Sequence, residues 1–164
     1  MPEHTGTAAN GEHERMQHSY GKLALMTVLS FIAMYVLMYA MVNRFANVYS
    51  NFNQFYMVGL MTAAMILIEL IVMGRMYPKK KLNAGLVIVS IVALVVCWLF
   101  IRQQTGIGDR QFLKSMIPHH GGAILMCNEA SIKDADIQKL CRGIVIGQQR
   151  EIDQMKAKLA QLSD

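Results

Sequence analysis

The sequence predicts an all-α membrane protein in which three transmembrane helices are followed by a helical hairpin. Two observations predict this class. Hydrophobic residues make up 54% of the 164 residues, which is too many for an ordinary soluble domain of this size. The last third of the chain instead has apolar residues at three- and four-residue spacing, which is typical of amphipathic helices. We expect a flexible polar tail at 1–21, a membrane region at 22–101, a linker at 102–108 and the helical hairpin at 109–164.

Three apolar runs are each long enough to cross a bilayer. They are Leu23–Val42, Phe55–Met73 and Leu82–Ile101. Each has about the ~20 residues that a hydrocarbon core of ~30 Å requires at a rise of ~1.5 Å per residue. The first run starts far into the chain and has no small-residue cleavage site behind it, so it does not read as a cleavable signal peptide.

Basic residues between the second and third runs predict the orientation in the membrane. Arg75 and Lys79, Lys80 and Lys81 cluster in this loop, and such clusters mark the cytoplasmic side. The C-terminal hairpin is then extracytoplasmic, in a multi-pass protein of a bacterial-type inner or plasma membrane. Because the net charge of +5 flanks the spans and forms no patch, it argues against nucleic acid as a partner.

Glu69 is the only formally charged residue inside the three runs. An intramembrane carboxylate is costly and marks either an ion path or a buried polar partner. Met57, Met61 and Met65 precede it at four-residue spacing, although methionine in a span is more often packing or lipid-facing. A Met–Glu route for copper across the membrane is therefore one hypothesis for this span.

The hairpin is predicted to consist of helices at 109–131 and 134–162, with Asp109 as the N-cap of the first helix and a kink at Pro118. Two short amphipathic helices bury too little surface to fold alone, because domains below ~40 residues usually need metal, disulfides or association. We therefore expect a second copy of the chain to complete a four-helix bundle, which makes the protein a homodimer.

Candidate metal ligands concentrate in the stretch SMIPHHGGAILMC at 115–127 and on the facing helix. The first helix supplies Met116, His119, His120, Met126 and Cys127. The second supplies Cys141, Gln148 and Met155 at seven-residue spacing, with Glu151 at the edge of the same stripe near the level of Ser115. Thioether, thiolate and imidazole donors together select soft or borderline ions, with Cu(I) the best match and Cu(II), Ag(I) or Zn(II) also suitable.

Most of these residues also have a structural interpretation. Met126 and Met155 are more often core side chains, and Gln148 either sets the helix register or supports a histidine. Cys127 and Cys141 are small buried hydrophobes or ligands. A disulfide ranks third, because packed helix axes lie ~8–10 Å apart and a disulfide requires Cα atoms within ~7 Å.

The adjacent pair His119 and His120 is harder to explain as core, which favours metal ligation. A catalytic role has less support, because the chain shows no nucleophile motif and no phosphate-binding loop. An enzyme is therefore the less favoured class, although the sequence does not decide the question.

Three stretches carry a resemblance to a known family: DRQFLKSMIPHH from Asp109, AILM from Ala123, and IVIGQQREIDQM ending at Met155. They resemble the domain-of-unknown-function 305 family, a ferritin-like helical family with some membrane-anchored members. The resemblance implies an extracytoplasmic helical bundle, linked in some members to copper binding and tolerance.

The family's ligand positions correspond here to Met116, His119, His120 and Met126, while Gln148, Glu151 and Met155 are motif positions of less certain role. This chain departs from the family pattern at three positions. Gly121 stands where glutamine is common, and Cys127 and Cys141 stand where alanine is common.

Three functions follow in order of preference. The first is a membrane-anchored copper-binding protein that contributes to metal handling or tolerance. The second is a structural or interaction module that dimerises through its hairpin without obligatory metal, with histidines used for packing or pH-dependent association. The third, a metal-dependent redox enzyme, lacks the paired Glu-x-x-His motifs of di-iron bundles.

Overall fold

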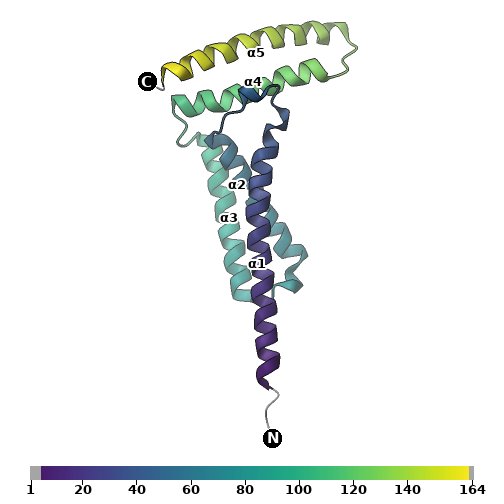
Figure 1. The fold of residues 1–164 in the computed structure, drawn as a ribbon, viewed down its shortest axis with the longest axis vertical. Helices are drawn as coiled ribbons and strands as arrows, with labels where there is room; N and C mark the ends of the chain where they lie inside the picture. The colour runs from purple at the N-terminus through teal and green to yellow at the C-terminus, as the bar shows by residue number, and fades with distance from the viewer. Residues whose placement is uncertain (1–4, 163–164) are drawn as a thin grey trace. The chain divides into compact units, whose positions relative to one another are not determined.

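The computed structural model describes the backbone of residues 5–162 and the side chains of residues 19–162, and in this part of the chain every regular element is a helix. This confirms the all-α class. Five helices, α1 to α5, form the fold (Figure 1): Thr5–Leu37, Phe52–Val72, Lys80–Gln103, Asp109–Glu129 and Ala135–Gln161. Short 3-10 helices lie at Met38–Met41 (η1), Phe45–Asn47 (η2) and Gly74–Met76 (η3).

The chain divides into two compact units. The membrane unit contains the residues up to Met34 together with Tyr56–Arg102. The hairpin unit contains Tyr35–Phe55 together with the residues from Gln103 on. The segment between the first two spans therefore belongs with the C-terminal hairpin and not with the spans.

Three helices are long and apolar enough to cross a membrane: Ser19–Met41, Phe52–Val72 and Lys80–Gln103. Each overlaps one of the three predicted spans. The predicted polar tail differs from the structure, because α1 is helical from Thr5 and continues into the first span without a boundary near residue 21. Residues 1–4 of that tail lie outside the described residues.

Glu69 has a buried polar partner in the membrane unit. The hydroxyl of Tyr77, a residue only 6% exposed, donates a hydrogen bond of 2.9 Å to Glu69 Oε1. Asn83 Nδ2 donates to the Tyr77 carbonyl at 2.7 Å, and Tyr20 donates to Asn83 Oδ1 at 2.8 Å. Burial and the nearby Glu69 raise the pKa of Tyr77 to about 12, so its phenol remains a donor at physiological pH. The Met–Glu copper route stays a prediction.

Helices α4 and α5 form an antiparallel pair around one small core (Figure 1). The buried residues of this core are Ile117, Ile124, Ile152 and Leu159, and Tyr49, Leu113, Val145 and Met155 pack against them. The helix bounds agree with the predicted bounds within two residues at each end. Burial of these aliphatic side chains drives the pairing, at about 25 cal/mol for each Å² of apolar surface removed from water.

The structure shows the N-caps of both hairpin helices. Gly108 is the N-cap of α4, and Asp109 lies in the first turn, so the predicted cap at Asp109 is wrong by one residue. A carboxylate in the first turn still stabilises the helix through its dipole. Asp134 caps α5, because its Oδ1 accepts hydrogen bonds of 3.0 Å from the backbone N–H groups of Asp136 and Ile137.

Cys127 and Cys141 form a disulfide between α4 and α5, with Cα atoms 5.3 Å apart. The prediction that ranked the disulfide last is therefore wrong. It compared the ~8–10 Å between helix axes with the Cα limit of a disulfide, but a Cα atom lies ~2.3 Å from its own axis. Two residues that face each other across packed helices thus bring their Cα atoms well inside ~7 Å.

A second side of α4 lies on the segment that contains η1 and η2 (Figure 1). Gly121 and Gly122 are buried there. A Cβ atom at Gly121 would lie 2.8 Å from Asn43 Oδ1, and one at Gly122 would lie 3.4 Å from the Met41 carbonyl oxygen. The glycine pair therefore permits this contact, and the hairpin has a partner within its own chain. The expected homodimer stays a prediction.

Hydrogen bonds within the segment hold it in place beneath α4. Asn47, which is 2% exposed, donates from Nδ2 to Asn43 Oδ1 at 2.8 Å. Tyr39 donates to the Tyr49 carbonyl at 2.9 Å, and Gln54 Nε2 donates to the Tyr35 carbonyl at 2.8 Å. Because these buried amides are paired, the segment presents a defined surface to the two glycines.

We expect Gly121→Ala to loosen the contact between α4 and the η1–η2 segment. The added methyl group would overlap Asn43 Oδ1, and overpacking of this kind costs about 1–3 kcal/mol. Hydrogen–deuterium exchange should show faster exchange in residues 41–47 and in the middle of α4. Gly143→Ala on α5 is the matched control, because a Cβ atom there meets nothing within 4 Å. Equal protection in the two variants would contradict the contact.

We expect the disulfide to stabilise the hairpin by about 3 kcal/mol, as in other closed loops of ~15 residues. The unfolded oxidised protein should take one alkyl group, at Cys97, and the reduced protein should take three. Reduction should lower the thermal stability of the hairpin in wild type and in Cys97→Ser alike. Three alkyl groups before reduction would show that the disulfide does not form.

Candidate metal centre

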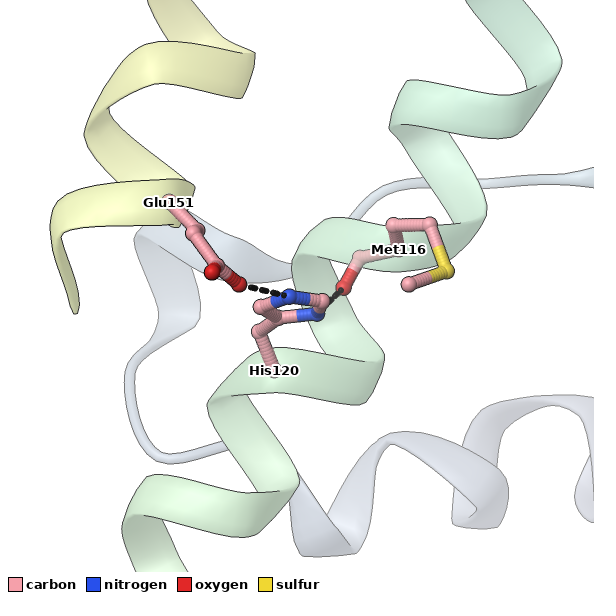
Figure 2. A network of polar contacts seen from close by, with 3 residues as sticks. All are labelled: Met116, His120 and Glu151. Carbon is pink, nitrogen blue, oxygen red and sulfur yellow. Dashed lines mark hydrogen bonds and ion pairs between the residues drawn. The ribbon is translucent and has the colours of Figure 1, made fainter. Parts of the chain in front are cut away.

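His120 on α4 contacts Glu151 on α5. Its residue is 7% exposed, and both ring nitrogens have partners (Figure 2). Nδ1 lies 2.9 Å from the carbonyl oxygen of Met116, one turn earlier on α4. Nε2 lies 2.8 Å from Oε2 of Glu151 on α5. The imidazole is therefore fixed in orientation from both sides.

The two partners of this imidazole are both hydrogen-bond acceptors. The Met116 carbonyl accepts only, so Nδ1 must carry a hydrogen. An ionised Glu151 also accepts only, so a neutral imidazole would direct a lone pair at a carboxylate oxygen 2.8 Å away. A proton between these two atoms, or a metal ion bound to both, removes that repulsion. The geometry therefore calls for a cation between His120 and Glu151.

The residues around this position fit a metal ion in three respects. One ion can bind both atoms of a pair 2.8 Å apart, because metal–nitrogen and metal–oxygen bonds are ~2.0–2.2 Å long. The Nδ1 contact to a backbone carbonyl is the arrangement that orients metal-ligating histidines. Glu151 keeps 49% of its side chain exposed, so an ion can reach the pair from solvent.

The side chain of His119 points in a different direction from that of His120. It is exposed, and its ring centroid lies 6.2 Å from that of His120 with the planes 63° apart. Consecutive residues on an α-helix are rotated by about 100°, so only one of the two can face α5. His119 lies near the site without contacting Glu151 in the described interactions.

The predicted sulfur donors are not gathered at His120. The side chain of Met116 extends away from the imidazole, which contacts the backbone carbonyl of that residue (Figure 2). Met126 is 53% exposed, and Met155 packs against the core of the hairpin. Cys127 and Cys141 are joined to each other, and a disulfide has no thiolate to give to a metal.

Gln148 lies on α5 between the disulfide and Glu151. Its Oε1 is buried without a hydrogen-bond partner among the described residues. Among the side chains of residues 19–162, no group of three or more His, Cys, Asp or Glu is placed to hold a metal ion. The structure of one chain therefore assembles two donors, the His120 nitrogen and the Glu151 carboxylate, and not the larger soft cluster that was expected.

Two features of the site were missed by sequence reasoning. Glu151 was expected near the level of Ser115, but it contacts His120, more than one turn away along α4. The register is set by the disulfide and the aliphatic core, which a face pattern does not specify. The contact of Gly121 with Asn43 was also missed. Its signal is the pair of glycines inside a helix, where glycine is otherwise unfavourable by about 1 kcal/mol.

The α4–α5 region matches a known family, and most of the chain is similar to a known protein. The family described as a domain of unknown function (DUF305) matches residues 102–159, which include α4 and most of α5. An uncharacterized protein of Acanthamoeba polyphaga mimivirus is 35% identical over 140 residues, which cover 84% of this chain and 90% of that protein. No solved structure matches the chain. The similarity to the viral protein extends beyond the hairpin, and the chain belongs to the DUF305 family.

Proposed function

We propose that this protein is a membrane-anchored metal-binding protein whose hairpin holds copper at His120 and Glu151 and contributes to metal handling or tolerance. The observation that carries the proposal is the imidazole between two acceptors, Met116 O at 2.9 Å and Glu151 Oε2 at 2.8 Å. His120 Nε2 and a Glu151 oxygen would bind the ion, and the Nδ1 contact would keep the ring oriented. The three apolar helices would anchor the hairpin.

The donor set favours Cu(II) over Cu(I). Nitrogen and oxygen ligands suit Cu(II), whereas Cu(I) prefers thiolate and thioether sulfur. The two hairpin cysteines are in a disulfide, and Met126 and Met155 do not contact His120 in the described interactions. The sequence-based preference for Cu(I) is therefore revised. A bound Cu(II) ion would be held without a nearby thiolate to reduce it.

The proposed location of the hairpin is extracytoplasmic. Disulfides persist in oxidising compartments, and Cys127 and Cys141 are paired. Lys79, Lys80 and Lys81 precede the third apolar helix, and such basic residues mark the cytoplasmic side. The hairpin follows the other end of this helix, which would therefore be extracytoplasmic. Both arguments support a protein that meets copper outside the cytosol.

The alternative is a structural or interaction module that needs no metal. The same contact favours this alternative, because a proton between His120 and Glu151 can hold the two side chains together without copper. In this case a second copy would complete a ferritin-like four-helix bundle without metal. Metal titration separates the two functions.

Copper titration of the detergent-purified full-length protein tests the proposal. We expect wild type to bind Cu(II), with nitrogen coupling in its electron paramagnetic resonance spectrum. Glu151→Gln should weaken binding by about tenfold or more and leave the helix content unchanged, because the amide still pairs with His120. Glu129→Gln, an exposed carboxylate at the end of α4, is the matched control and should bind as wild type does.

His120→Ala should remove the nitrogen coupling that arises from this residue. Equal affinity in wild type, Glu151→Gln and His120→Ala would contradict copper binding at this site. Binding of no copper by the wild type, with a folded hairpin, would favour the structural module.

A further inference from the structure

Among the described residues, the main contacts of helix α4 lie on two of its sides. One side faces α5, and a second lies on the η1–η2 segment. On the third side, three exposed residues recur at seven-residue spacing: Phe112 at 51% exposure, His119, and Met126 at 53%. A spacing of seven keeps residues on nearly the same side of a helix. These three residues therefore share one exposed side of α4.

Helix α5 extends the same surface. His119 directly precedes His120, Met126 precedes Cys127, and Leu140 on α5 precedes Cys141. Each preceding residue is rotated by about 100° from a residue that faces the other helix. Because α4 and α5 are antiparallel, the preceding residues of the two helices lie on the same side of the helix pair.

We call this surface the open face. It consists of Phe112, His119 and Met126 on α4 with Leu140, Ile144 and Glu151 on α5. Leu140 is 61% exposed, and a shallow pocket beside it is lined by Gly143 and Ile144 among others. Asp136 and Lys139 also line this pocket, so charged residues lie beside Leu140 at that end. Phe112 lies at the other end of the open face, and His119 and Glu151 lie in between.

We propose that a second copy of this chain docks on the open face and that the partner's His119 completes the metal site at His120 and Glu151. The proposal rests on the proposed copper function. One chain supplies His120 and Glu151 but, within its described residues, no cluster of three His, Cys, Asp or Glu ligands. A copper ion takes about four donors in a tetragonal nitrogen and oxygen site. The remaining donors to the copper ion must then come from outside the His120–Glu151 pair.

Symmetry places the partner's His119 near this site. Two copies that meet through the same face form a two-fold interface, and residues near the middle of that face lie close to the axis. His119 is the middle member of the Phe112 to Met126 stripe. Glu151 lies at the same level, since it contacts the adjacent His120. The partner's His119 can therefore approach the Glu151 carboxylate across the interface.

Charge complementarity favours a second copy over another partner. Glu151 uses Oε2 for His120, and 49% of its side chain stays exposed toward solvent. A carboxylate at an interface requires a positive group opposite, and a metal ion bound to the partner's His119 supplies one. The open face contains both halves of this pair, so it is complementary to itself.

Mixing two defective variants tests whether His119 acts across the interface. His119→Ala lacks the donated ligand, and His120→Ala lacks the receiving site. Each homodimer should bind copper weakly. Co-refolded or co-expressed in equal amounts, the two should regain about a quarter of the wild-type copper content, because half of the dimers are mixed and each has one intact site.

If His119 acted within its own chain, no mixed dimer would contain an intact site and the mixture would bind as weakly as its components. That result would overturn the proposal. So would a wild-type monomer that binds one copper ion per chain, although the copper function would then stand. A wild-type dimer that binds no copper would instead contradict both the copper function and the shared site.

Leu140→Glu tests the face itself. It should shift the protein toward the monomer in light scattering and reduce copper affinity by about tenfold or more. Ile146→Glu is the matched control, because Ile146 is 72% exposed on the side of α5 away from the open face. It should leave both the oligomeric state and copper binding unchanged. Loss of copper binding in both variants would show a general loss of the fold and contradict a specific face.

Discussion

The pairing of His120 with Glu151 requires a proton or a metal ion between the two side chains, and the candidate site depends on this requirement. A backbone carbonyl on one side and a carboxylate on the other give the imidazole two acceptors at 2.9 and 2.8 Å. A neutral ring satisfies only one of them. Without a proton or a metal ion at the second position, the two helices would bring two electron-rich atoms together. The function proposed here follows from which cation takes that position.

The rest of the hairpin unit explains why the pair is held so closely. The disulfide fixes the level of α4 against α5, and the aliphatic core between them keeps Glu151 opposite His120. The glycine pair that follows His120 lets α4 rest on the η1–η2 segment, where a larger residue would meet Asn43. Glycine at 121 thus permits a contact within the chain.

Much of the fold could be predicted from the sequence because long apolar runs and three- to four-residue spacing are local signals. The three spans and the ends of α4 and α5 followed from these patterns. Contacts between segments distant in sequence were not predictable in the same way. The place of Glu151 depends on helix register, and the contact between Gly121 and Asn43 joins residues far apart in the chain. The error on the disulfide arose from using the distance between axes for the distance between Cα atoms.

The candidate site was predicted in part. His120 and Glu151 were among the named ligands, but the sulfur donors lie in a disulfide, in the core or on the surface. A face pattern shows that donors share one side of a helix. Adjacent donors such as His119 and His120 are rotated by about 100°, and the pattern does not show which of them contacts Glu151. The site therefore has fewer donors than expected, and they are nitrogen and oxygen instead of sulfur. This difference explains the change from Cu(I) to Cu(II) in the proposed function.

Nitrogen-15 spectra of the histidine rings test the central claim most directly. In the metal-free protein, His120 should carry hydrogen on both ring nitrogens. Adding Zn(II), a diamagnetic ion with the same preference for nitrogen and oxygen, should remove the hydrogen from Nε2 and leave the one on Nδ1. A His120 ring with one hydrogen in the metal-free protein and no change on adding Zn(II) would contradict a cation between His120 and Glu151.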